Sequence, residues 1–289
     1  MIPSVRCLQL SAALLVLCLA IPAVVKASAL ERLFAPKAEL WERWTRHAAQ
    51  DARRISHAEW DRFLVTYVAN PDGGVNRVAY GSVTEADRAS LAAYIDRLSG
   101  IRISDYSRAE QFAYWVNLYN ALTVEVVLDH YPVASIRDID ISPGLFADGP
   151  WRKHLVTVED EKLTLDDIEH RILRPIWNDP RIHYAVNCAA LGCPNLQTAA
   201  FTAQNTAQLL NKGARDYVND PRGVRIEDGQ VTASSIYSWF KPDFDQDGGV
   251  IAHIRRYAAP GLLAELEGID RVSDYDYDWS LNADGGPKN

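Results

Sequence analysis

The spacing of hydrophobic positions predicts one long buried helix over residues 108–130. Its apolar side chains recur every three or four positions and form a broad face: Phe112, Trp115, Val116, Tyr119, Leu122, Val126 and Val127. Ser107, followed three residues later by Glu110, forms a capping box that marks the first turn. The face that carries Asn117 and Asn120 is also flanked by apolar residues. A helix that is apolar almost all round is expected to be buried.

The rest of the chain predicts shorter helices interleaved with hairpins. Residues 60–68 read equally well as a strand or a short helix. Helices are expected at 84–99, 166–173, 203–218, 235–240, 249–257 and 261–267. Hairpins are expected at 155–165 and 224–231, and strands at 182–188 and 275–282. Because no regular βαβ rhythm is present, the predicted fold class is α+β, a single domain with a mixed or antiparallel sheet packed with helices.

The first 29 residues resemble a secretory signal peptide. Arg6 precedes an apolar run from Leu8 to Leu19, and Ala27-Ser28-Ala29 is a small-residue cleavage site. The run is short for a transmembrane span, although an uncleaved anchor stays open as an alternative. Cys18 follows Leu17 rather than a small residue, which disfavours a lipoprotein. We therefore expect a periplasmic or secreted protein whose mature chain begins after Ala29 and has no transmembrane span.

Charge and length narrow the possible functions. The 289 residues carry a formal net charge of −8, and removal of residues 1–29 takes away two basic residues and no acid. Such an acidic surface repels phosphate, so nucleic-acid binding is not expected.

We expect an N-terminal helical segment at 30–50, which either docks on the body or binds a partner, and one globular domain at 51–289. The ligand is predicted to be a small molecule or a peptide, with no cofactor.

Several sequence blocks resemble domain-of-unknown-function family 547. They are Phe112–Leu122, Tyr131–Ile139, Leu163–His170, Asp179–Cys188, Gly192–Pro194 and Tyr277–Asn282. The matching blocks span residues 108–282 in order, which we take as the family-like core. The resemblance implies no particular activity and provides no catalytic residues.

A thiol nucleophile is the first candidate chemistry. Cys188 and Cys193 are the only cysteines after the signal segment, and His183 lies close by in the sequence. A Cys with a His base performs acyl transfer through its thiolate. On the predicted strand His183 and Cys188 point to opposite faces, so Cys193, after the flexible Gly192, is the better nucleophile. Asn117 would orient the histidine or donate to an oxyanion.

A polar cleft is predicted around this thiol, with Trp115, Tyr119, Asn120 and Asn187 as further binding residues. A polar helix followed by a strand with a histidine is loosely similar to papain- and transglutaminase-type folds, although Asn117 stands where those folds place cysteine. The alternative is that the buried asparagines only tie neighbouring loops together.

The main alternative for the cysteines is a structural disulfide. Four residues separate Cys188 from Cys193, enough for a turn that brings the Cα atoms within the roughly 4.4–6.8 Å that a disulfide needs. An oxidising compartment favours this bond. A redox pair is less favoured because the spacing is not Cys-x-x-Cys, and zinc is less favoured because no usual ligand spacing is present.

An acidic loop is the remaining candidate site. Asp243, Asp245, Asp247 and Gly248 reproduce the first half of an EF-hand loop, but Ile254 stands where a bidentate Glu is required. We therefore predict an acidic turn rather than a calcium site. The sequence favours an exported cysteine-dependent hydrolase or acyl transferase acting on peptide- or amide-like bonds. The competing reading is a non-catalytic, disulfide-braced binding or envelope-associated module.

Overall fold

The computed structural model describes residues 25–26, 35–70, 73–144 and 148–284. Its α-helices are α2 (Ala58–Tyr67), α3 (Glu85–Ser99), α4 (Arg108–His130), α5 (Arg174–Trp177), α6 (Thr206–Val218), α7 (Ile236–Trp239), α8 (Lys241–Asp245), α9 (Val250–Tyr257) and α10 (Pro260–Glu265). Its strands are β1 (Val25–Lys26), β2 (Val68–Ala69), β3 (Arg77–Val78), β4 (Val156–Val158), β5 (Glu161–Leu163), β6 (Val224–Glu227), β7 (Gln230–Ser234) and β8 (Asp274–Tyr277). This mixture of helices and small sheets confirms the α+β fold class.

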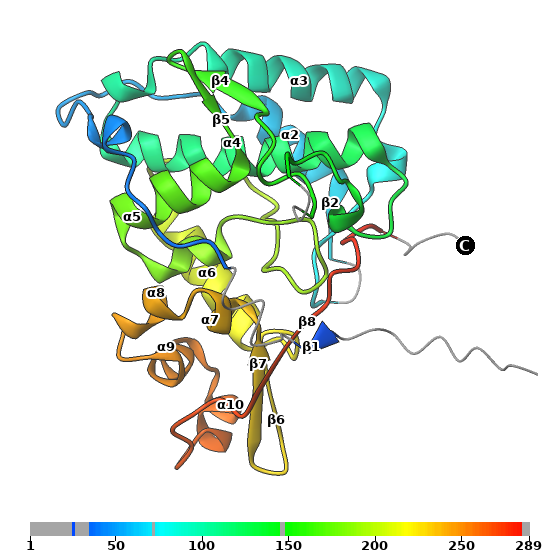
Figure 1. Ribbon diagram of the computed structural model, residues 1–289, viewed down its shortest axis with the longest axis vertical. Helices are drawn as coiled ribbons and strands as arrows, with labels where there is room; N and C mark the ends of the chain where they lie inside the picture. Colours follow the sequence, from blue (N-terminus) through cyan, green and yellow to red (C-terminus); the bar gives the residue numbers. More distant parts are fainter. Residues whose placement is uncertain (1–24, 27–34, 71–72, 145–147, 285–289) are drawn as a thin grey trace, which may run out of the picture.

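Helix α4 is the centre of the larger hydrophobic core, as its pattern predicts. Ser107 accepts a hydrogen bond from the Glu110 N–H group and so caps the first turn. Nearly every side chain of the helix up to Leu128 is buried. Figure 1 shows α4 in the helical part of the molecule with α2, α3 and α5, whereas β6, β7, α9 and α10 form the opposite end. Among the described residues, no helix is long and apolar enough to cross a membrane.

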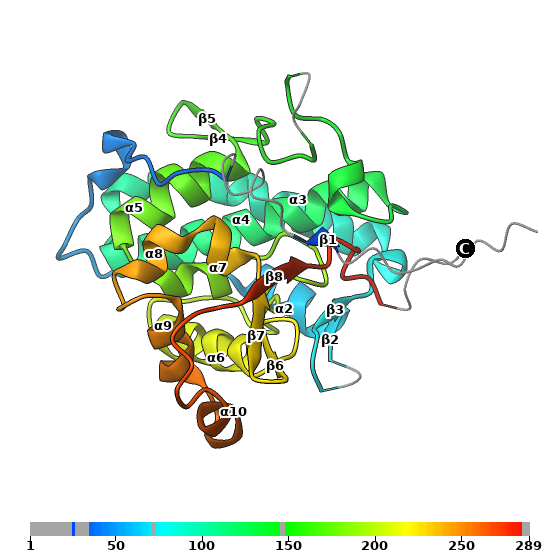
Figure 2. The same ribbon diagram turned by 60° about the horizontal axis from the view of Figure 1, so that its bottom comes forward.

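The second core cluster lies under the four-stranded sheet. Strand order is β1-β8-β7-β6, with β7 parallel to β8 and the other pairs antiparallel. Figure 2 shows β8 lying alongside β7, with β1 near its far end. The hairpins predicted at 155–165 and 224–231 are confirmed as β4–β5 and β6–β7. The predicted end strand is confirmed in part as β8.

The strand predicted over residues 182–188 is wrong. Residues Pro180–Tyr184 form a 3-10 helix, capped by the Asp179 side chain, and the chain then runs irregularly to Cys188. Alternating apolar residues misled the prediction, because this segment is buried on all sides and needs no polar face. Its backbone groups are bound by its own helical turn and by the Asn120 side chain instead of by a neighbouring strand. His183 and Cys188 therefore do not lie on opposite faces of a strand.

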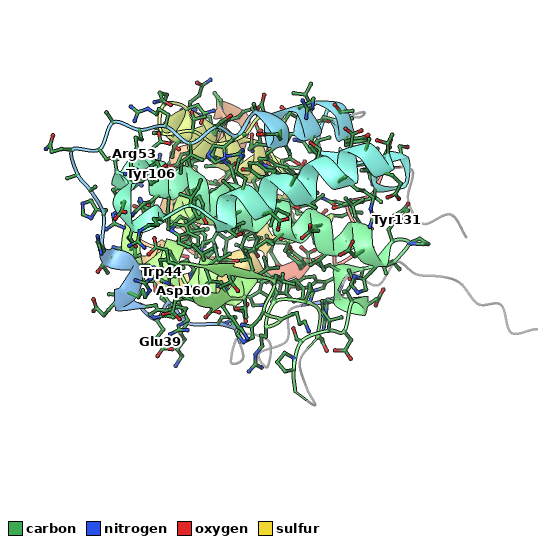
Figure 3. All side chains as sticks on the ribbon, turned by 90° about the horizontal axis from the view of Figure 1, so that it is seen from above. Glu39, Trp44, Arg53, Tyr106, Tyr131 and Asp160 are labelled. Carbon is green, nitrogen blue, oxygen red and sulfur yellow. The ribbon has the colours of Figure 1, made fainter. Side chains whose placement is uncertain are left out.

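The segment before α2 docks on the body. Residues 35–50 contain only one short 3-10 helix, Glu42–Thr45, and residues 30–34 of the predicted helical segment lie outside the described residues. The N–H group of Glu39 donates to the carbonyl of His170 at 2.9 Å. Trp44 is buried and meets Trp115 edge to face, with ring centroids 5.0 Å apart. Figure 3 shows this stretch running along one side of the helical layer, past Glu39 and Trp44.

Glu125 on α4 gives a first testable prediction. Burial and the nearby Asp129 and Asp96 raise its pKa to about 7. A folded-state pKa above the unfolded one costs stability as the pH rises from about 4.5 to 7. Because the side chain is partly exposed, we expect Glu125→Gln to raise the free energy of unfolding by only about 1 kcal/mol at pH 8, and not at all at pH 4.5. Urea unfolding at both pH values measures this.

The exposed Glu265 on α10 provides the control for this change, because Glu265→Gln removes the same charge from a solvated position. We expect it to change the free energy of unfolding by less than about 0.5 kcal/mol at either pH. If Glu125→Gln raises the free energy of unfolding equally at pH 4.5 and pH 8, the charge of Glu125 is not what destabilises the wild-type protein.

Candidate functional site

A cavity of about 740 Å³ lies between the helical layer and the four-stranded sheet. Aromatic rings form much of its wall: Tyr119, Trp151, Trp239, Phe240, Tyr277 and Trp279. Polar and ionisable side chains complete it: Arg137, Asp148, Arg152, Asp166, Glu169, His170, His183, Cys188 and Cys193. A large apolar pocket with a few convergent polar groups is the usual form of a ligand site. The cavity therefore locates the candidate site.

A π-helical turn carries much of the polar wall. The predicted helix at 166–173 is a π-helix over Asp167–Leu173, and α5 continues it directly. The helix continues through Pro175, because this residue occupies the first turn of α5, where a proline is tolerated. Single π-turns inside helices are frequent at functional sites. Here the turn directs Glu169 and His170 into the cavity wall.

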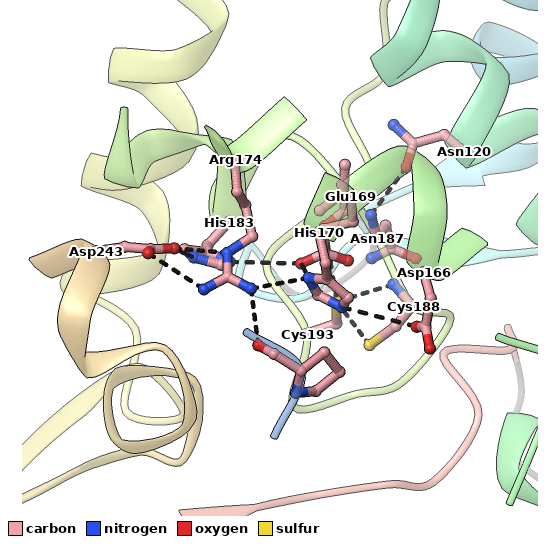
Figure 4. Close-up of polar contacts among 12 residues, drawn as sticks. Asn120, Asp166, Glu169, His170, Arg174, His183, Asn187, Cys188, Cys193 and Asp243 are labelled. Carbon is pink, nitrogen blue, oxygen red and sulfur yellow. Dashed lines mark hydrogen bonds and ion pairs between the residues drawn. The ribbon is translucent and has the colours of Figure 1, made fainter. Parts of the chain in front are cut away.

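Arg174 is the central charge of the site. Its side chain is only 4% exposed, and its guanidinium donates two hydrogen bonds, of 2.7 and 3.1 Å, to the Asp243 carboxylate. It also donates to the Pro36 carbonyl and to Nδ1 of His170, each at 2.9 Å. Figure 4 shows Arg174 between Asp243 and His170. Arg174 therefore joins the docked N-terminal segment, the π-turn and α8 in one network.

His183 lies between two carboxylates. Its Nε2 is 2.8 Å from Asp243 Oδ2, and its Nδ1 is 3.6 Å from Glu169 Oε1. Its ring stacks on Phe240 at 4.4 Å. Both ring nitrogens thus face acids, so neither presents a free lone pair toward a thiol. No hydrogen bond joins His183 to Cys193 among the contacts of the described residues.

His170 has a defined tautomer. A guanidinium only donates hydrogen bonds, so Nδ1 of His170 accepts from Arg174 and the ring proton sits on Nε2. Burial and Arg174 lower the pKa of His170 to about 4, which keeps the ring neutral. Its Nε2 lies 3.7 Å from Asp166 Oδ1. Burial and Glu169 raise the pKa of Asp166 to about 7. Asp166 is therefore a cavity carboxyl that exchanges a proton near neutral pH.

Glu169 supplies the fixed negative charge of the wall. Burial by itself would raise its pKa, but His170, His183 and Arg174 around it lower that pKa to about 2. Burial and the Glu169 carboxylate raise the pKa of Tyr119 well above its ordinary value. Tyr119 therefore stays protonated as a donor toward Glu169. Asp166 and Glu169 thus hold different protonation states near pH 7, a pattern typical of sites that move protons.

The two cysteines form a second cluster on the same wall. Sγ of Cys193 accepts hydrogen bonds from the main-chain N–H of Cys188 and from its thiol, both at 3.0 Å. The Tyr277 hydroxyl lies 3.1 Å from Sγ of Cys188. Burial by itself would raise the pKa of Cys193, but the bonds from Cys188 lower it below the ordinary thiol value. The bond to Cys193 and burial raise the pKa of Cys188. Cys193 is therefore the more acidic thiol of the pair.

The disulfide predicted between Cys188 and Cys193 is not formed in this structure. A disulfide requires an S–S distance of about 2.05 Å, and the two Sγ atoms are 3.0 Å apart as free thiols. The short loop does bring the sulfur atoms into contact, as its length suggested. The contact is a hydrogen bond rather than a covalent bond.

The thiol turn rests on the strand end after β8. The N–H group of Gly192 donates to the Asp278 carbonyl at 2.8 Å. A side chain at Gly192 would place its Cβ 2.7 Å from the Asp278 nitrogen, so only glycine fits this approach. The left-handed residue of the turn is Ala189, with φ of 58°, and not Gly192. Gly192 thus matters for its missing side chain rather than for its backbone freedom.

The three predicted asparagines act as ties between segments. Asn117 donates to the Phe201 carbonyl at 2.8 Å and accepts from its N–H at 3.0 Å, so both ends of its amide are bound to Phe201 rather than to a thiol. Asn120 bridges the Ala185 carbonyl and the Asn187 N–H. Asn187 in turn donates to the Pro194 carbonyl at 2.7 Å. These bonds hold the irregular segment that carries both cysteines.

The remaining predicted residues are spread over the core and the acidic loop. Trp115 packs in the core against Trp44, away from the cavity lining. The acids of the EF-hand-like loop have separate partners: Asp243 pairs with Arg174, Asp245 with Lys241, and Asp247 with His253 and Arg256. Within the part of the chain that is described, no cluster of three or more potential metal ligands occurs.

Sequence reasoning missed four ionisable residues of the cavity wall, Asp166, Glu169, His170 and Tyr277, and it missed Arg174, which contacts His170. One signal was available, because Glu169 and His170 stand beside Ile168 and Ile172 in a short apolar helix, where charged residues are rarely buried without a partner.

Comparison with known protein families finds a match over part of the chain. The family model described as "Protein of unknown function, DUF547" matches residues 103–218, which include α4, the π-turn and both cysteines. No curated protein and no solved structure matches the chain.

Proposed function

We propose that this chain, which contains a DUF547 domain over residues 103–218, is a thiol enzyme that cleaves or transfers acyl groups. Because the family's description names no activity, the proposal rests on the site alone. The observation that carries this proposal is the pair of hydrogen bonds from Cys188 to Sγ of Cys193 on the cavity wall. A thiolate held by N–H and S–H donors is a nucleophile at neutral pH.

The proposed reaction begins with attack of the Cys193 thiolate on the carbonyl carbon of an amide. A C–S bond forms, the C–N bond breaks, and the amine leaves with a proton from Asp166. Water then attacks the thioester, gives its proton to Asp166 and releases the carboxylic acid and the thiolate. Asp166 suits both steps because its pKa of about 7 lies at the working pH.

The surrounding residues have supporting roles in this proposal. Arg174 fixes the tautomer of His170 and holds Asp243 against His183. The aromatic wall excludes water and packs against the substrate. Asn117 is assigned a structural role here rather than the orienting role that its sequence position suggested, because both ends of its amide are bound by Phe201.

We also propose that the protein is exported, on the basis of the signal pattern in residues 1–29. An oxidising compartment favours oxidation of adjacent thiols. A non-catalytic, disulfide-braced binding module is therefore the second candidate function, and the 3.0 Å separation of the two Sγ atoms is the observation that favours it.

One experiment tests both candidates. The protein is purified from the exported fraction, and its intact mass shows where the mature chain begins. Native protein is then treated with iodoacetamide between pH 5 and 10, and the modified cysteine is mapped by mass spectrometry. We expect Cys193 to be alkylated first, with a midpoint at lower pH than for an ordinary thiol. Denatured protein, in which both cysteines react, is the control.

Two outcomes would contradict the thiol enzyme. If the denatured protein takes up no alkyl group, the cysteines are joined and the disulfide-braced module is favoured. If Cys188 reacts before Cys193 in the native protein, the assignment of the thiolate is wrong.

A further inference from the structure

Strand β8 presents one edge to the thiol turn and the opposite edge outward. The carbonyl of Asp276 accepts a hydrogen bond from the Ser235 N–H group at 2.8 Å. The carbonyl of Asp278 accepts one from Gly192 at 2.8 Å. Main-chain groups of successive strand residues point to opposite edges. The N–H and C=O groups of Tyr277 therefore face the outer edge of β8.

The chain's own β1 lies on this outer edge. Val25 pairs with Tyr277 and Lys26 with Asp276, in antiparallel register. Because the main chain of Tyr277 faces this edge, the pair with Val25 is the hydrogen-bonded one. The edge therefore accepts an extended segment, and the segment that occupies it comes from the predicted signal sequence. Export would remove these residues and leave the edge open.

The side chain of Tyr277 connects this edge with the cavity. Its hydroxyl is 3.1 Å from Sγ of Cys188, and its ring lies 4.9 Å from that of Trp239 and 4.7 Å from that of Trp279. Residues paired across two strands place their side chains on the same face of the sheet. A peptide residue opposite Tyr277 would thus direct its side chain toward the aromatic wall, a position that favours an apolar residue.

From this juxtaposition we propose that the outer edge of β8 binds an extended peptide as an added antiparallel strand. This inference rests on the proposed function, because it assigns peptides as the substrate class of the thiol site. The main-chain bonds to Tyr277 supply affinity, as in other sites of strand addition. The side chain opposite Tyr277 supplies selectivity. The scissile bond is brought to the cavity that Cys193 lines.

The test uses a peptide of the chain's own sequence from Pro22 to Ser28, capped at both ends. The protein lacks residues 1–29 and carries Cys193→Ser, so that binding is measured without chemistry. The described members of both hydrophobic clusters begin at Trp41, so this truncation removes none of them. Binding is followed by calorimetry and by intrinsic tryptophan fluorescence, to which Trp239 and Trp279 beside Tyr277 contribute.

Two N-methylated peptides provide the matched comparison. A methyl group on the Val25 nitrogen blocks the bond to Tyr277, whereas one on the Lys26 nitrogen points away from the edge. We expect the first change to weaken binding at least about 10-fold and the second to leave it within about 2-fold. The full chain, with β1 in place, should bind the unmodified peptide at least about 10-fold more weakly than the truncated chain.

Equal binding of the two methylated peptides would overturn the proposal, as would no binding at millimolar peptide. Equal binding by the full and truncated chains would also overturn it, because β1 would not occupy the same edge. If sedimentation shows that the truncated chain dimerises and the peptide does not dissociate the dimer, the occupant is a second copy and the proposal is wrong. Since the variant lacks the nucleophile, peptide binding and cysteine alkylation succeed or fail independently.

Discussion

Cys193→Ser is expected to lower the rate of acylation by p-nitrophenyl acetate by about 10³-fold or more, whereas Cys188→Ser should lower it less than about 10-fold. A serine hydroxyl at position 193 stays protonated at neutral pH and is a poor nucleophile without a base. A serine at position 188 keeps its main-chain N–H and its side-chain donor toward the Cys193 sulfur. The acetyl group is located by peptide mass spectrometry.

The two cysteine variants control each other, because both replace one sulfur atom in the same turn. Their melting temperatures should agree within a few degrees, since a serine fits each space. Equal loss of acylation in both, together with equal and large destabilisation, would point to a structural role for the pair. Acetylation at a residue other than Cys193 in the wild-type protein would exclude it as the nucleophile.

Asp243→Asn is expected to lower the free energy of unfolding by about 3 kcal/mol. The change removes the charge that compensates the buried Arg174 and contacts His183. In a chain of this size that loss corresponds to a drop in melting temperature of roughly 6–12 °C. Asp245→Asn on the same helix is the control, because Asp245 pairs with Lys241 in solvent. We expect it to cost less than about 0.5 kcal/mol.

The pH dependence of the stability difference between the wild type and Asp243→Asn tests whether the Asp243 charge is its cause. Hydrogen bonds from His183 and Arg174 outweigh burial and hold the pKa of Asp243 well below its usual range. A lowered folded-state pKa gives stability that is present above the unfolded pKa of about 3.8 and is lost as the pH falls below it. The gap between wild type and Asp243→Asn should therefore shrink below pH 4. A gap that stays constant in acid would mean that the carboxylate charge does not stabilise the site.

Much of the helical layer and the position of the thiol turn follow from local sequence. The Ser107 N-cap and the apolar faces of residues 108–130 determine α4, because caps and periodicity act within a few turns of chain. The other half of the predicted capping box is not formed, because the Glu110 carboxylate accepts from the Ile55 N–H group instead. The Cys188–Cys193 spacing likewise brings two sulfur atoms together. The prediction failed at residues 182–188, where a fully buried segment has no polar face to reveal its period.

Only the tertiary structure decided the chemistry of the site. Asp243 reaches Arg174 and His183 across 69 and 60 residues, and in the sequence it looked like part of a calcium loop. Tyr277 reaches Cys188 across 89 residues. The sequence by itself determined which elements form, because propensity and capping are local. Which ionisable groups meet, and hence which hold or release a proton, depends on burial and on partners that only the folded chain brings together.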